Sequence, residues 1–126
     1  MDQNTDKSPI FLFENQVAWE AWLKLHFSSA NMVWLKIAKK GSDTISVSYD
    51  EAVESALCFG WIDSQGASFD NQYYLQKFSP RRPKSKWSKS NCKRAEALIA
   101  SGRMQAAGLH QIQLAKQDGR WEAAYS

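Results

Sequence analysis

The chain is organised around residues 78–91, which read FSPRRPKSKWSKSN. Pro80 and Pro83 exclude a helix and remove two backbone donors from any strand, so the part of this stretch that carries its first four cations is predicted to be an irregular loop. Ser88 is a suitable N-cap, and a helix is predicted to follow it as far as Gly102. The loop therefore brings its cations to the positive end of a helix, a place that attracts anions. These cations are Arg81, Arg82, Lys84 and Lys86.

Charge is distributed unevenly along the 126 residues. Residues 1–80 hold six basic and ten acidic side chains, a net charge of −4, whereas residues 81–126 hold ten basic and three acidic ones, a net charge of +7. Seven bases and no acid lie between Arg81 and Arg94. Because the net charge of the whole chain is only +3, the sequence predicts a local basic patch rather than a generally basic protein.

Length and composition fit one domain, because 44% apolar residues with six tryptophans can build a core at this size. We expect a flexible tail at residues 1–9 and a single domain at residues 10–126. The first nine residues lack the apolar core of a signal peptide, and no stretch is long enough to span a bilayer, so a cytoplasmic location is expected. Two isolated cysteines and two histidines offer neither a zinc-ligand spacing nor a disulfide framework, so no metal and no cofactor are expected.

The N-terminal half contains the signals of two helices and a strand. Asn15 is a plausible N-cap for a helix at 16–27, where apolar residues recur at three- and four-residue spacing. Residues 32–38 are β-branched and aromatic and predict a strand. Ser48 opens a capping box, and the helix that follows is expected to stop at Gly60.

The remaining elements complete an α+β fold. Residues 61–65 and 73–78 predict a hairpin, which with the strand at 32–38 gives a small, mainly antiparallel three-stranded sheet with helices packed on it. A short apolar stretch that includes Ile10 is expected to lie on the core as a short strand or an extended arm. Two helices, at 89–101 and 105–117, predict an antiparallel C-terminal pair, with Trp121 and Tyr125 docking behind it.

Three separated blocks of sequence carry a family resemblance. They are ALCFGWID at 56–63; YLQKF at 74–78 with PRRP at 80–83 and SKWS at 85–88; and LIASGRM at 98–104 with AGL at 107–109. In this order they resemble the YdeI/OmpD-associated family, also called the bacteriocin-protection family. The resemblance implies an uncharacterised bacterial protein linked to envelope stress and to resistance against antimicrobial peptides. It brings no catalytic residues, and it implies a periplasmic location, whereas this sequence shows no signal peptide.

The basic loop is the first candidate site. Its four cations, with Trp87 and the Ser88 cap, have the chemistry to hold a phosphate, a carboxylate or a nucleic-acid backbone. The alternative is a solvated connection in which one arginine pairs internally with Asp63 or Asp70.

Trp61 and Asp63 form the second candidate site. Asp63 lies on a strand that begins immediately after a helix. One interpretation is that it enters a cleft beside the basic loop, where it orients an arginine or acts as a base. The interpretation that we favour is a structural role, at the end of a strand face or in a buried ion pair. Cys58 and Cys92 are expected to pack rather than to act as nucleophiles with His110.

These residues leave three functional hypotheses. The first is a non-enzymatic binding protein that uses the basic loop and the helix start to bind an anionic small molecule or an acidic surface. The second is a nucleic-acid-binding module in which aromatic residues of the 73–78 strand add stacking to the same cations. The third, an enzyme acting on a small anionic substrate, has the least support because no acid–base pair or nucleophile motif is readable.

Overall fold

The computed structural model describes residues 8–126, so most of the predicted tail lies outside the described residues. Along the chain the elements are β1 (Ile10–Phe11), α1 (Gln16–His26), β2 (Val33–Ala38), α2 (Tyr49–Cys58), β3 (Trp61–Ser68), β4 (Tyr73–Pro80), α3 (Lys89–Ala100), α4 (Ala106–Gln117) and α5 (Arg120–Ala124). The fold is therefore α+β, as predicted.

The helices begin where the capping residues predict. Asn15 accepts a hydrogen bond from the Ala18 amide at 2.9 Å, and Ser88 accepts one from the Asn91 amide at 3.0 Å. Ser48 and Glu51 form the full capping box, with both reciprocal bonds in place. Local side-chain chemistry thus determines three helix starts.

The sheet has four strands in the order β1-β2-β4-β3 and is mixed rather than purely antiparallel. β1 runs parallel to β2, with Ile10 beside Trp34, whereas β4 is antiparallel to both β2 and β3. The predicted three-stranded sheet was close but incomplete, because two residues of β1 are too few to produce a periodic signal. β4 also extends to Pro80, which pairs with Trp61, so the strand ends two residues later than predicted and the irregular loop begins at Arg81.

β3 forms one edge of the sheet, and its pairing with β4 is irregular. The register shifts between Asp63 and Gly66, which is the signature of a β-bulge. From Ser64 onward the strand is exposed.

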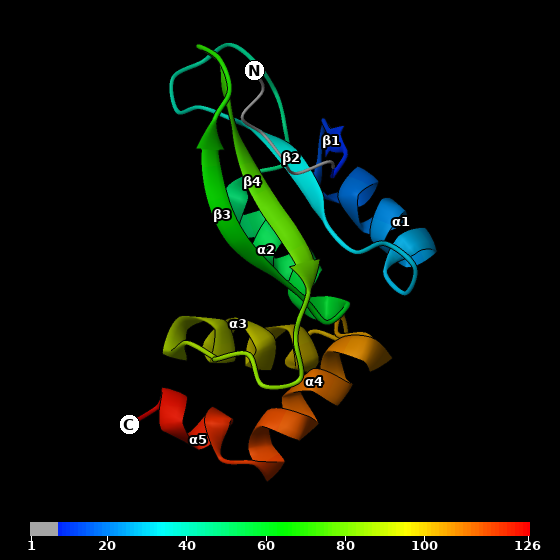
Figure 1. Ribbon diagram of the computed structural model, residues 1–126, viewed down its shortest axis with the longest axis vertical. Helices are drawn as coiled ribbons and strands as arrows, with labels where there is room; N and C mark the ends of the chain where they lie inside the picture. Colours follow the sequence, from blue (N-terminus) through cyan, green and yellow to red (C-terminus); the bar gives the residue numbers. More distant parts are fainter. Residues whose placement is uncertain (1–7) are drawn as a thin grey trace.

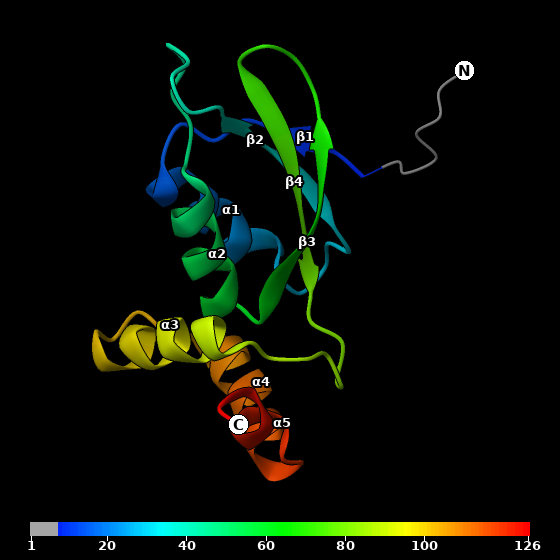
Figure 2. The same ribbon diagram turned by 90° about the vertical axis from the view of Figure 1, so that its left-hand side faces the viewer.

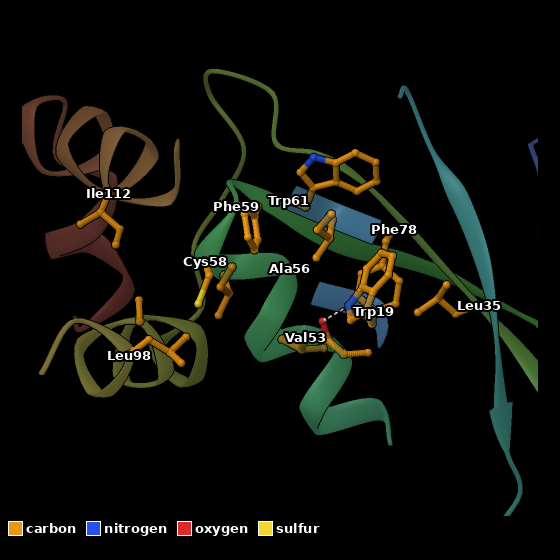
Figure 3. Packing of buried hydrophobic residues seen from close by; sticks show 14 of the residues in the cluster. Trp19, Leu35, Val53, Ala56, Cys58, Phe59, Trp61, Phe78, Leu98 and Ile112 are labelled. Atoms are coloured by element: carbon orange, nitrogen blue, oxygen red, sulfur yellow. Dashed lines mark hydrogen bonds between the residues drawn. The ribbon is translucent and has the colours of Figure 1, made fainter. Parts of the chain in front are cut away.

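One face of the sheet is covered by helices α1 and α2, and the other face carries none of the described helices (Figures 1 and 2). Leu35 of β2 and Phe78 of β4 point to the covered face and are fully buried. Trp19 of α1 packs against Phe78 and donates a hydrogen bond from its indole to the Ala52 carbonyl at 3.0 Å (Figure 3). Alternation places the following residues on the other face: Trp34, Lys36, Tyr73, Leu75, Lys77 and Ser79.

The C-terminal helices form a second part of the same core, at the end of α2 (Figure 1). Leu98 of α3 and Ile112 of α4 lie near Cys58 of α2, so α2 connects them to the core beneath the sheet (Figure 3). Both predicted C-terminal helices are present, but the predicted antiparallel pair is wrong, because α3 and α4 make their main contacts with α2 and with the short helix α5 rather than with each other. Helix α5 buries Trp121. Tyr125 stays 37% exposed, and its hydroxyl donates to Glu96.

Helices α4 and α2 meet at a backbone-to-backbone contact that requires glycine. A Cβ atom on Gly108 would lie 2.4 Å from the Leu57 carbonyl oxygen and 2.6 Å from that of Cys58. The Cys58 oxygen also accepts a hydrogen bond from the Gln105 amide at 3.2 Å. The position of α4 is therefore set by the carbonyl end of α2.

We expect Gly108→Ala to destabilise the protein even though alanine is the better helix former. Forcing the two helices apart should cost about 1–3 kcal/mol, which exceeds the helix-propensity gain of about 1 kcal/mol. Urea unfolding followed by tryptophan fluorescence measures the change. Gly66→Ala is the matched control, because the added Cβ would have 3.8 Å to its nearest neighbours. An unchanged or higher unfolding free energy for Gly108→Ala would contradict the close contact.

Candidate functional site

The basic loop divides into a buried part and an exposed part. Arg81 is only 5% exposed and Trp87 only 7%. Arg82, Lys84 and Lys86 are exposed. The four cations therefore do not converge on one site: Arg81 turns inward, and the other three lie at the surface.

Arg81 anchors the loop to the body of the protein. Its guanidinium carbon lies 3.7 Å from the centre of the Trp87 ring, a cation–π stack. Its Nη1 donates to the Ser85 hydroxyl at 2.8 Å and to the Lys86 carbonyl at 3.3 Å, and its backbone amide donates to the Gly60 carbonyl at 2.9 Å. Burial, with a smaller contribution from the nearby charge of Arg120, lowers the pKa of Arg81 to about 10, so the group stays charged at neutral pH.

Arg120 fastens the same loop to α5. Its Nε is 2.9 Å from both carboxylate oxygens of Asp118, and its Nη1 donates to the Ser85 carbonyl at 2.5 Å. The ring centroids of Trp87 and Trp121 are 5.0 Å apart. Both arginines thus bind Ser85, and two tryptophans close the junction between loop and helices.

Arg82 faces the opposite way and lines an open concavity of 310 Å³ beside the β3–β4 hairpin. Lys77 of β4 is a second cation of this concavity, and its Nζ lies 5.4 Å from the centre of the Trp34 ring. Polar side chains and apolar walls complete the lining: Ser64, Gln65, Ser79, Ser85, Met32, Ile62 and Pro80. The concavity thus combines two cations with several hydrogen-bonding groups.

Ser88 and Trp61 have local partners of their own. The Ser88 hydroxyl is occupied in capping α3. Trp61 is 1% exposed, and its indole donates to the Phe27 carbonyl at 3.2 Å, so it belongs to the core rather than to a surface.

Asp63 is engaged by a tyrosine, not by an arginine. Its Oδ2 accepts a hydrogen bond from the Tyr49 hydroxyl at 2.6 Å, which ties β3 to the start of α2. Burial, followed by the bond to Asp63, raises the pKa of Tyr49 to about 12. Asp70 is exposed and accepts from the amides of Tyr73 and Gln72, which lower the pKa of its carboxyl group. Within residues 8–126, the internal pair between Arg81 and Asp63 or Asp70 is therefore not formed.

Several residues of this region gave no signal in the sequence. Ser85 and Arg120 are brought together by tertiary structure, since 35 positions separate them along the chain. Lys77 and Ser79 could have been assigned to the helix-free face by strand alternation once Phe78 was placed in the core. Arg103, which also gave no signal in the sequence, forms salt bridges with Glu20 at 2.5 Å and with Glu54 at 3.3 Å. These ion pairs connect α1, α2 and the α3–α4 turn.

The fold and the basic loop together define a small α+β domain with a cationic surface and a buried arginine. Residues 11–111 match the model of a family described as a domain of unknown function, DUF8412. The match spans most of the chain, so the protein belongs to this family. No curated protein and no solved structure shows a significant match. Among the described helices, none has both the length and the apolar character required to cross a membrane.

Both cysteines are predicted to be unreactive in the folded protein. Cys58 is 2% exposed and Cys92 fully buried, and burial raises the pKa of both thiols, that of Cys58 to about 11. His110 is exposed on α4. At pH 8 only about one Cys58 thiol in a thousand is ionised, so a thiol-specific disulfide reagent should label neither cysteine until denaturant is added. Rapid labelling of one thiol in the native state would show that a reactive cysteine exists.

Proposed function

We propose that the protein is a non-enzymatic binding protein that takes an anionic ligand on the surface formed by the exposed part of the basic loop and the hairpin concavity. The observation that carries this proposal is that two cations, Arg82 and Lys77, line the same concavity, which also presents hydroxyl and amide side chains. Arginine can hold a carboxylate or phosphate through two parallel hydrogen bonds, whereas lysine acts as a point charge. Lys84 and Lys86 extend the positive field beyond the concavity.

The chemistry of this surface favours binding over catalysis. Asp63, the carboxylate that the sequence offered as a candidate base, is held by Tyr49. Both thiols are buried. The lining of the concavity has cations and neutral donors but no carboxylate, so a general acid–base pair is not among its residues.

The physiological role that we propose follows the resemblance to the YdeI/OmpD-associated family: a bacterial protein linked to envelope stress or to resistance against antimicrobial peptides. Such peptides are rich in lysine and arginine. A basic surface repels them, so on this proposal the protein acts through an anionic small molecule or an acidic partner surface rather than by capturing the peptides.

Charge reversal tests this surface directly. In Arg82→Glu/Lys84→Glu, binding of citrate and of polyglutamate should weaken by about tenfold or more, because two attractive charges become repulsive. Amide shifts in an NMR titration report binding, and thermal unfolding confirms the fold. Lys24→Glu/Lys40→Glu is the matched control, since both lysines are exposed and lie outside the basic loop. Equal loss in both variants, or ligand shifts that bypass Arg82 and Lys77, would refute the assignment.

Nucleic-acid binding is the second candidate function, and an observation on the helix-free face favours it. The Lys36 Nζ lies 4.6 Å from the ring centre of Phe69 and 5.5 Å from that of Tyr73, and Phe69 is 44% exposed. Phe78 is fully buried and Tyr74 packs against the core, so stacking would fall to Phe69 and Tyr73 instead.

A salt titration separates this candidate from the first. Affinity for a single-stranded oligonucleotide should fall steeply with salt, with a logarithmic slope of about −0.7 per phosphate contacted. Phe69→Ala should weaken binding of the oligonucleotide and leave citrate binding unchanged, because base stacking contributes only to oligonucleotide binding. Absence of binding at low salt would eliminate the nucleic-acid candidate.

A further inference from the structure

Beneath the basic loop, several buried hydrogen-bond donors have no partner among the described residues. Arg81 uses Nη1 for Ser85 and Lys86, while its Nε and Nη2 are buried and unpartnered. The same holds for Nη2 of Arg120 and for the indole Nε1 of Trp87. Buried polar groups are rarely left unsatisfied in folded proteins, so each one calls for a partner.

The unused edge of Arg81 has a defined geometry. Nε and Nη2 carry parallel N–H bonds on one side of the guanidinium plane, and this edge is one that binds oxoanions through two oxygens. The Trp87 ring covers a face of the guanidinium, and the two nitrogens of the unused edge are buried without a hydrogen-bond partner among the described residues. The side chain is therefore fixed in an orientation that presents two donors together.

The donors of Arg120 and Trp87 belong to the same junction. Both arginines are bound to Ser85, and Trp87 is in contact with both Arg81 and Trp121. Gln111 of α4 contributes one unpartnered acceptor, Oε1, and lies beside Gly60, whose carbonyl accepts from the Arg81 amide. Rotating the Gln111 amide by half a turn would place its NH₂ group there instead.

The junction also carries uncompensated positive charge. The charges that face Arg81 are those of Arg120 and Asp63, together with the thiol of Cys92. Asp63 is held by Tyr49, Arg120 is paired with Asp118, and the Cys92 thiol has a raised pKa and stays neutral. The positive charge without a paired carboxylate at this junction is therefore that of Arg81. A buried charge without a counter-ion is strongly destabilising, so a bound anion would stabilise this part of the fold.

We propose that the junction of Arg81, Arg120 and Trp87 binds a small inorganic oxoanion, phosphate or sulfate, which the Nε–Nη2 edge of Arg81 holds in bidentate fashion. Nη2 of Arg120 and Nε1 of Trp87 supply the remaining donors. The occupant is small because the donor atoms are all buried. This site differs from the surface concavity of Arg82, and it holds the basic loop against α5 whether or not a ligand occupies that concavity.

The wild-type protein provides the first test. Phosphate and sulfate, titrated separately at constant ionic strength with chloride as the balancing salt, should shift the Nε1–H resonance of Trp87 and the Nε–H resonance of Arg81 in a saturable manner. Both anions should also raise the thermal midpoint relative to chloride, because they bind the folded state. Shifts at Arg82 and Lys77 alone would place the anion in the concavity and overturn the buried site. If neither anion produces a saturable shift of these resonances, the partner of the donors is water and the buried anion site is overturned.

A conservative variant then tests the geometry. Arg81→Lys keeps the charge and loses the bidentate edge, so phosphate affinity at the Trp87 resonance should fall by about tenfold or more. Arg94→Lys is the matched control, because Arg94 of α3 pairs with Asp50 of α2 and lies outside the junction. Unchanged affinity in Arg81→Lys would refute the bidentate site. If Arg81→Lys does not fold, the same measurement on Arg120→Lys, together with the wild-type titration, decides whether the junction binds the anion.

Discussion

The stack of Arg81 on Trp87 is the interaction on which the arrangement of the two parts of the molecule depends. It lies where β4 ends and the chain turns toward the C-terminal helices, and the backbone amide of Arg81 also donates to the Gly60 carbonyl at the junction of α2 and β3. One residue thus connects the α2–β3 junction through its backbone, the loop through its side chain and, by way of Ser85 and Arg120, the last helix. A residue that the composition would assign to the surface is instead part of the internal framework.

The division within the basic loop follows from this anchor. Because Arg81 is held inside, the chain direction sends Arg82 toward the hairpin and leaves Lys84 and Lys86 exposed. The positively charged surface consequently contains fewer cations than the basic loop holds in the sequence. It adjoins the helix-free face of the sheet, where Lys36 and Lys77 add further positive charge beside aromatic rings.

Much of the fold could be predicted from the sequence because the relevant signals are local. Asn15, Ser48 and Ser88 mark helix starts through bonds to amides three residues away, and these predictions were confirmed. For Ile10 the sequence left a short strand and an extended arm open, because the strand with which it pairs, β2, lies more than twenty residues ahead. The burial of Arg81 could not be predicted, because its environment is built by Trp87, Ser85 and Arg120 after the chain has folded.

The irregular pairing of β3 has a consequence for the behaviour of the protein in a crowded solution. An exposed edge strand normally offers a template on which another chain can add a strand and begin to aggregate. The register shift between Asp63 and Gly66 breaks the regular pairing of β3 with β4 at the polar residues Ser64 and Gln65, and a bulge of this kind increases the local twist of an edge strand. The strand that frames the concavity is thereby a poor template for self-association, which leaves the adjoining cationic surface free for a different kind of partner.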